Sequence, residues 1–101
     1  MPKKETYREK RCRFTKILAK LILYANSLGY EVAIDRARDD NSKYLHKYSL
    51  AADLNLYKDS KYLRSTKSHE LLGLYWESMG GSWGGRFSDG NHYSLAYRGM
   101  R

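Results

Sequence analysis

Apolar residues recur at three- and four-residue steps between Phe14 and Leu28. The recurring positions are Phe14, Ile17, Leu18, Leu21, Ile22, Ala25 and Leu28. This spacing places them on one face of an α-helix, and Gly29, which follows directly, is a residue type that commonly ends helices. The pattern therefore predicts an amphipathic helix with one buried face.

Residues 30–35 and residues 49–57 alternate in polarity with a period of two, which is typical of half-buried β-strands. In the second segment Asp53 lies near the middle, on the face opposite to Leu50, Ala52, Leu54 and Leu56. The polar residues 38–47 lie between the two segments. We predict two strands joined by a loop.

Helical spacing returns in residues 68–79, where Ser68 is a candidate N-cap and Gly80 with Gly81 is a stop signal. The apolar positions of this segment are Leu71, Leu72, Tyr75, Trp76 and Met79. Residues 92–97 alternate again and predict a last strand. The order helix, strand, strand, helix, strand predicts a small α+β domain in which two main helices flank an antiparallel sheet.

The length of 101 residues suits a single domain. Six Lys or Arg residues and two Glu residues fall within residues 1–13, so half of the net charge of +8 is concentrated there. We interpret residues 1–13 as a basic arm and residues 14–101 as the folded domain. Cys12 is the single cysteine, which excludes a disulfide within the chain.

Lys16 and Lys20 interrupt the most apolar segment, which argues against a secretion signal and against a membrane span. We therefore expect synthesis in the cytoplasm without a signal peptide. A monomer is the default expectation for the oligomeric state. The excess of cations is compatible with nucleic acid, with an anionic cell envelope or with solubility alone. Ten tyrosines beside these cations could stack on single-stranded nucleic acid, but we find no known nucleic-acid motif and expect no specific nucleic acid.

Two histidines stand at metal-ligand spacing from aspartates: His46 is seven residues before Asp53, and His92 is three residues after Asp89. Seven residues span about 10 Å along a helix and about 23 Å along a strand, whereas the ligands of one metal each lie about 2 Å from it. The chain must therefore turn back between His46 and Asp53. Residues 89–91, Asp-Gly-Asn, form a turn signal that would bring His92 to the start of a strand.

These residues match the needs of a hydrolytic zinc site, which has three protein ligands and one open position. The candidate Zn²⁺ ligands are His46, Asp53 and His92. Asp89 is the candidate general base, a role worth roughly 10²–10⁴ in rate. Arg38, just past the first predicted strand, is the candidate cation for the developing oxyanion.

Each of these residues also has an ordinary structural interpretation. The histidines could be core or surface residues, and Asp53 could form a salt bridge. Asp89 could be a turn residue, and Arg38 could belong to a basic surface. His69 has no matching partner, so we expect it at the exposed start of the second helix.

Five segments between Phe14 and Leu95 together carry a family resemblance. They are LILYANSLGYEV, the stretch Asp35-Arg36-Ala37-Arg38, His46 with AADLNLYKDSKYL, LLGLYWESMGGSWGGRF and DGNHYSL. The sequence resembles the zinc D-alanyl-D-alanine carboxypeptidase and L-alanyl-D-glutamate endopeptidase family, which includes phage endolysins.

The resemblance implies a small α+β sheet of the D-Ala-D-Ala peptidase type with Zn²⁺ on its concave face. It implies that the metal is held by the residues matching His46, Asp53 and His92, with Asp89 as general base and Arg38 at the scissile carbonyl. The implied activity is cleavage of a peptide bond in the stem peptides of bacterial peptidoglycan, in the host periplasm if the protein is encoded by a phage. Whether the enzyme is an endopeptidase or a carboxypeptidase stays open.

The sequence departs from the family pattern in three places. Tyr44 and Ser49 stand where many relatives have serine and glycine, and the connection from Arg38 to His46 is shorter. The alternative is therefore a non-catalytic module that binds zinc or, through its basic surface, nucleic acid.

Overall fold

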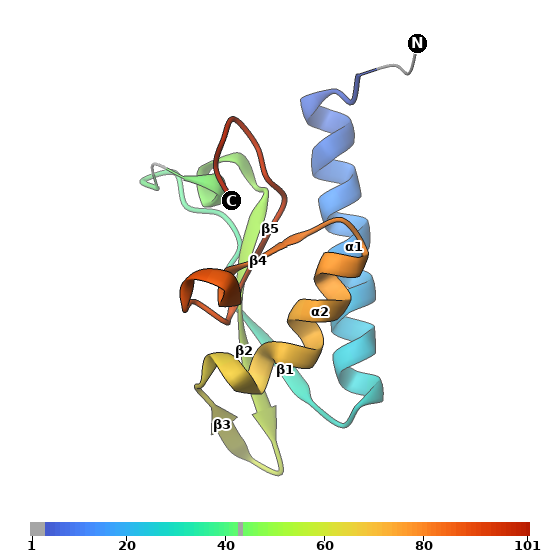
Figure 1. Ribbon diagram of the computed structural model, residues 1–101, viewed down its shortest axis with the longest axis vertical. Coiled ribbons are helices and arrows are strands. Elements are labelled where there is room, and N and C mark those ends of the chain that lie inside the picture. The colour runs from blue at the N-terminus through green and yellow to red at the C-terminus, as the bar shows by residue number, and fades with distance from the viewer. Residues whose placement is uncertain (1–3, 43) are drawn as a thin grey trace.

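The computed structural model describes residues 4–42 and 44–101 (Figure 1). Within these residues it contains two α-helices, five strands and three short 3-10 helices. The helices are α1 (Tyr7–Ser27) and α2 (Glu70–Ser78), and the strands are β1 (Glu31–Arg36), β2 (Ala51–Lys58), β3 (Lys61–Leu63), β4 (Ser82–Trp83) and β5 (His92–Ser94). The 3-10 helices are η1 (Leu45–Tyr48), η2 (Thr66–His69) and η3 (Gly84–Phe87). The predicted α+β class, with a small antiparallel sheet and two main helices, is confirmed.

β2 is the central strand of the sheet, in the order β1-β2-β5-β4, and β3 pairs with β2 beyond the end of β5. All of these pairs are antiparallel. The sequence did not predict β3 and β4, because three and two residues are too few to show an alternating pattern.

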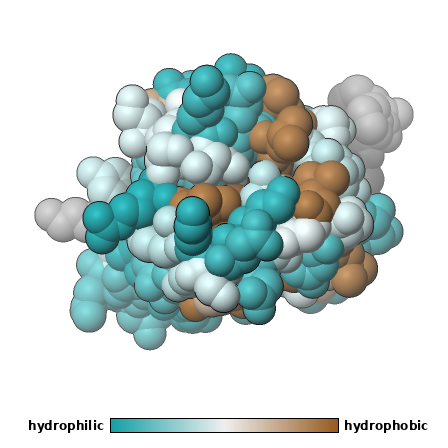
Figure 2. Space-filling view, turned by 90° about the horizontal axis from the view of Figure 1, so that it is seen from below, coloured by the Kyte–Doolittle hydropathy of each residue, from teal (hydrophilic) through white to brown (hydrophobic). Residues whose placement is uncertain are grey.

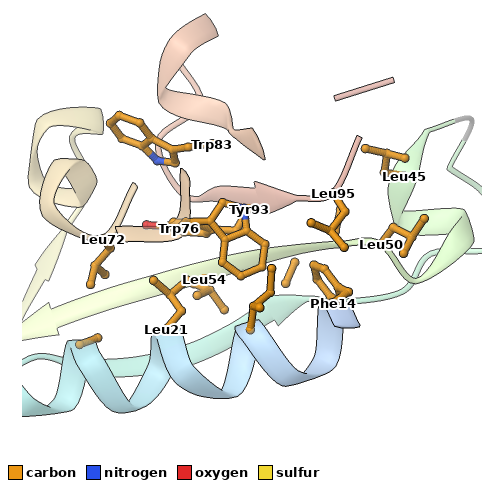
Figure 3. Packing of buried hydrophobic residues seen from close by; sticks show 14 of the residues in the cluster. Phe14, Leu21, Leu45, Leu50, Leu54, Leu72, Trp76, Trp83, Tyr93 and Leu95 are labelled. Carbon is orange, nitrogen blue, oxygen red and sulfur yellow. The ribbon is translucent and has the colours of Figure 1, made fainter. Parts of the chain in front are cut away.

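The core lies between α1 and the sheet (Figure 3). α1 contributes Phe14, Ile17, Leu21 and Ala25, which are the buried residues of the predicted apolar face. Leu54 and Leu56 of β2 are at most 1% exposed and belong to the same core. Because side chains alternate along a strand, Asp53 lies on the opposite face of the sheet, away from α1. The sheet therefore separates the hydrophobic core from the polar residues of interest.

α1 begins earlier than the sequence indicated, at Tyr7. A capping box fixes this start, because the Thr6 hydroxyl accepts a hydrogen bond from the Glu9 amide and the Glu9 carboxylate accepts one from the Thr6 amide. Residues 7–13 are therefore helical and continue into the rest of α1. Residues 1–3 lie outside the described residues.

Two long-range hydrogen bonds hold the first turns of α1 against the rest of the molecule. The Tyr7 hydroxyl donates to the Tyr48 carbonyl at 2.6 Å, and the Lys10 ammonium donates to the Ala96 carbonyl at 2.8 Å. Contacts between positions so far apart in sequence leave no trace in the local pattern of charges.

The second helix also starts differently from the prediction. Ser65, not Ser68, is the capping residue: it caps η2, whose turn precedes α2. This extra turn carries His69 inward, where it is 1% exposed and its Nδ1 lies 2.7 Å from the Tyr93 hydroxyl. The expectation of an exposed His69 is therefore wrong.

The described helices include none that is long and apolar enough to cross a membrane. Figure 2 shows one face of the molecule, on which hydrophobic residues form several small patches among hydrophilic ones. Scattered apolar residues of this kind are usual on a protein surface.

Candidate metal centre

The three predicted ligands lie together on the face of the sheet opposite to α1. Asp53 of β2 is the cross-strand partner of His92, the first residue of β5. The His92 Nδ1 lies 3.2 Å from the Asp53 Oδ1, and the His46 Nε2 lies 3.3 Å from the same oxygen. Potential ligand atoms of the three residues all lie within 4.8 Å of one another.

The predicted reversal of the chain between His46 and Asp53 is confirmed. His46 lies in η1, and Ser49 ends η1 in the left-handed conformation, with φ of 58°. Leu45, 1% exposed, anchors η1 in the core, and the Leu50 amide donates to the Leu45 carbonyl. These contacts carry His46 back over the strand on which Asp53 lies.

The predicted turn before His92 is confirmed as well. The His92 amide donates to the Asp89 carbonyl at 3.1 Å, which closes a tight turn over residues 89–92. Gly84 packs against this turn so closely that a Cβ at this position would overlap the carbonyl oxygen of Asp89 and the Cβ of His92. Glycine is therefore needed at residue 84 to keep Asp89 and His92 in place.

A β-bulge brings Arg36, which was not among the predicted site residues, beside Asp53. The register of β1 on β2 shifts between Ile34, opposite Leu54, and Arg36, opposite Asp53. Without the extra residue Asp35, strict alternation would set two aspartates against each other. Instead the Arg36 Nε lies 3.3 Å from the Asp53 Oδ2. The arginine therefore fixes the carboxylate oxygen that faces away from the histidines.

Arg38, by contrast, points elsewhere. It is exposed, its Nε donates to the Asp40 carboxylate at 3.0 Å, and it contacts the Ser49 hydroxyl at 3.4 Å. It does not line the cleft described below. The structure thus brings four of the five predicted residues together and leaves Arg38 outside. Arg36 could have been considered because it lies in the same short stretch as Arg38. The bulge that places Arg36, and not Arg38, beside Asp53 is not visible in the polarity pattern.

Of the three residues, His46 has the surroundings that most favour a role as a metal ligand. It is 3% exposed, and neither ring nitrogen forms a hydrogen bond with any described residue, although Nε2 lies 3.3 Å from the Asp53 Oδ1. Leaving a buried polar atom without a partner costs about 1–3 kcal/mol. Burial lowers the pKa of His46, and Arg36 and His92 lower it further against the attraction of Asp53. The imidazole is therefore neutral at pH 7, the form that binds metals.

Asp53 is held as a carboxylate. Burial alone would raise its pKa, but the hydrogen bond from His92 and the charges of His46, His92 and Arg36 outweigh burial and lower it. Two imidazoles and one carboxylate are a donor set that suits zinc, and three protein ligands leave one position open. The residues present therefore fit a zinc ion.

A cleft of about 440 Å³ opens beside these residues. His46, His92 and Asp89 line it together with Arg36, and aromatic and apolar side chains form its walls. The wall residues are Tyr44, Phe87 and Met100. This volume is within the range of small-ligand sites and would accept a few residues of a peptide. Asp89 is exposed in the cleft, which is where a residue that exchanges protons with a substrate must lie.

Comparison with protein-family models and with curated proteins finds no match for this chain.

Proposed function

We propose that this protein is a zinc-dependent peptidase that cleaves a peptide bond in the stem peptides of bacterial peptidoglycan. The observation that carries the proposal is the cluster of His46, Asp53 and His92 beside a peptide-sized cleft, with a buried His46 imidazole whose ring nitrogens form no hydrogen bond with the described residues. The resemblance of the sequence to peptidoglycan peptidases supplies the substrate class.

His46, Asp53 and His92 would hold the ion. When bound, zinc supplies Lewis acidity that polarises a carbonyl and lowers the pKa of a bound water to about 7. Asp89 takes the proton of the attacking water on its carboxylate and passes it to the departing amine nitrogen.

Arg36 takes the place expected for Arg38. A guanidinium has five N–H donors, and ion pairs with Asp39 and Asp53 engage only part of them. The remaining N–H groups are available to the oxygen of the scissile carbonyl, where negative charge develops. The ion pair with Asp53 at the same time keeps this carboxylate oriented.

The test measures zinc content and turnover of purified muropeptides for the wild type, for Asp89→Asn and for His92→Ala. We expect one zinc per chain in the wild type and in Asp89→Asn, with turnover reduced about 10²-fold or more in Asp89→Asn. His92→Ala should lose the metal. Asp59→Asn, an exposed residue of the β2–β3 turn, is the matched control and should keep full turnover.

Stoichiometric zinc without turnover in the wild type would replace the peptidase with a structural zinc module. Absence of zinc would overturn the proposal as a whole. The mass of the released fragment, free D-alanine or a longer piece, distinguishes a carboxypeptidase from an endopeptidase.

A further inference from the structure

A second cavity, of about 600 Å³, lies between the first turns of α1 and the chain segment 96–99. It adjoins the cleft, because Gly99 lines both. The Tyr97 amide bonds to the Met100 carbonyl, and Arg98 and Gly99 both have positive φ, so the chain makes a tight turn at this point. Gly99 thus lies where the two hollows meet, and having no side chain it places no side-chain barrier between them.

The second cavity is positively charged. Lys4, Lys10 and Arg98 line it. Glu5 is its acidic residue, and two hydrogen bonds of 2.8 and 3.0 Å engage its carboxylate with Arg13. A ligand that fills this cavity is therefore expected to carry negative charge.

The aromatic rings here already have cationic partners. The Arg98 guanidinium lies 5.4 Å from the ring centre of Tyr48 and 5.2 Å from that of Tyr97, and the Lys10 ammonium lies 5.6 Å from the Tyr97 centre. Tyr7 and Tyr97 also pack against each other. The rings therefore position the cations and offer few free faces on which nucleic-acid bases could stack. An anion without aromatic bases fits these surroundings better than a nucleic acid.

We propose that the second cavity binds phosphodiester groups of a polyol-phosphate polymer of the cell envelope while a stem peptide occupies the cleft. The proposal rests on the proposed function, because it is the attachment of the peptide to the cell wall that would bring such a polymer next to the cleft. A guanidinium and ammonium groups in one cavity suit phosphate oxygens, for which both groups are common partners.

The test measures binding of soluble poly(glycerol phosphate) to the full chain. The double variant Lys4→Gln/Arg98→Gln removes two charges from the cavity, and Lys16→Gln/Lys20→Gln removes two from the exposed side of α1, outside it. We expect the first variant to bind about tenfold or more weakly, and the second to bind within about twofold of the wild type. Arg98→Lys, which keeps the charge, should retain most of the binding. Circular dichroism and thermal melting check that each variant is folded.

Equal weakening in both double variants would overturn the proposal in favour of diffuse charge attraction. Tighter binding of single-stranded DNA than of poly(glycerol phosphate) would overturn it in favour of a nucleic-acid surface, and absence of saturable binding would overturn it outright. Turnover of soluble muropeptides by the wild type, measured in parallel without polymer, tests the proposed function separately. Turnover without polymer binding removes this proposal alone, and polymer binding without turnover removes the peptidase alone.

Discussion

Arg36 and Arg38 are two residues apart, yet they meet different surroundings. Arg36 lies opposite Asp53 on the neighbouring strand and lines the cleft, whereas Arg38 pairs with Asp40 at the surface. Neighbours that orient a metal ligand typically contribute 10–100-fold to metal affinity or activity. The two arginines therefore provide a matched pair for mutagenesis.

We predict that Arg36→Gln lowers kcat/KM on muropeptides by about 10–100-fold and weakens zinc binding, because Asp53 loses the group that orients it. Arg38→Gln should stay within about threefold of the wild type. Steady-state kinetics and zinc titration measure both effects. The reverse order, with Arg38→Gln the more damaging, would restore the role that the sequence suggested for Arg38.

Ser49 has a φ of 58° at the end of η1. Many members of the family that this sequence resembles have glycine at the matching position. The left-handed conformation costs a residue with a Cβ roughly 1–2 kcal/mol, and the greater flexibility of glycine in the unfolded chain returns part of that difference. We predict that Ser49→Gly raises the free energy of unfolding by about 0.5–1 kcal/mol in urea denaturation. Ser78→Gly, within α2, is the matched control and should lower it by about 1 kcal/mol or less. Loss of stability in Ser49→Gly would show that its contact with Arg38 outweighs the backbone effect.

At the scale of elements, the site depends on three connections that aim side chains at one point. η1 supplies His46, β2 supplies Asp53, and the turn before β5 supplies Asp89 and His92. η3 supports that turn, with Gly84 in direct contact with it. An element that carries none of the candidate ligands thus supports the elements that carry them.

We predict that Gly84→Ala destabilises the fold by about 2–4 kcal/mol, because the new methyl group would overlap the Asp89 carbonyl and the His92 Cβ. The turn must move to relieve the overlap, so zinc affinity should fall as well. Urea denaturation and zinc titration of the folded variant measure the two effects. Unchanged stability together with unchanged zinc affinity would show that η3 can shift freely.

At the scale of the whole molecule, a buried histidine makes stability depend on pH. Burial lowers the pKa of His69 to about 4, from about 6.5 in an exposed chain. Between these values the unfolded chain binds more protons than the folded protein, so stability falls as the pH falls through this window and is flat above it. The contribution of His69 to this loss is at most about 3 kcal/mol.

We predict that His69→Gln, which keeps a polar group near the Tyr93 hydroxyl but does not titrate, loses less stability than the wild type between pH 6.5 and 4. Urea denaturation with a chelator present removes any contribution from metal binding. His46, whose pKa is also lowered, is common to both proteins and cancels in the comparison. Parallel stability curves would show that His69 is accessible to protons in the folded state.

Much of the fold could be predicted from the local spacing of apolar and polar residues. The apolar repeat of α1 and the alternation of β2 each depend on neighbours in sequence, so they could be read directly, and β2 placed Asp53 on the face away from the helix. The turn before His92 is also local, and the sequence Asp-Gly-Asn at residues 89–91 predicted it. The candidate ligands and Asp89 were therefore accessible from the sequence.

Other features of the site depend on contacts between residues that are far apart in sequence, and only the tertiary structure shows them. A bulge in the pairing of β1 with β2 selected Arg36 over Arg38, and packing against β5 buried His69. Tyr44, Phe87 and Met100 became walls of one cleft although they are far apart in the chain. A one-residue shift in register changes which side chains face each other without changing the polarity pattern, and a long-range contact leaves no periodic trace. The sequence by itself thus determined the candidate ligands and the face of the sheet they occupy, and tertiary structure determined their neighbours.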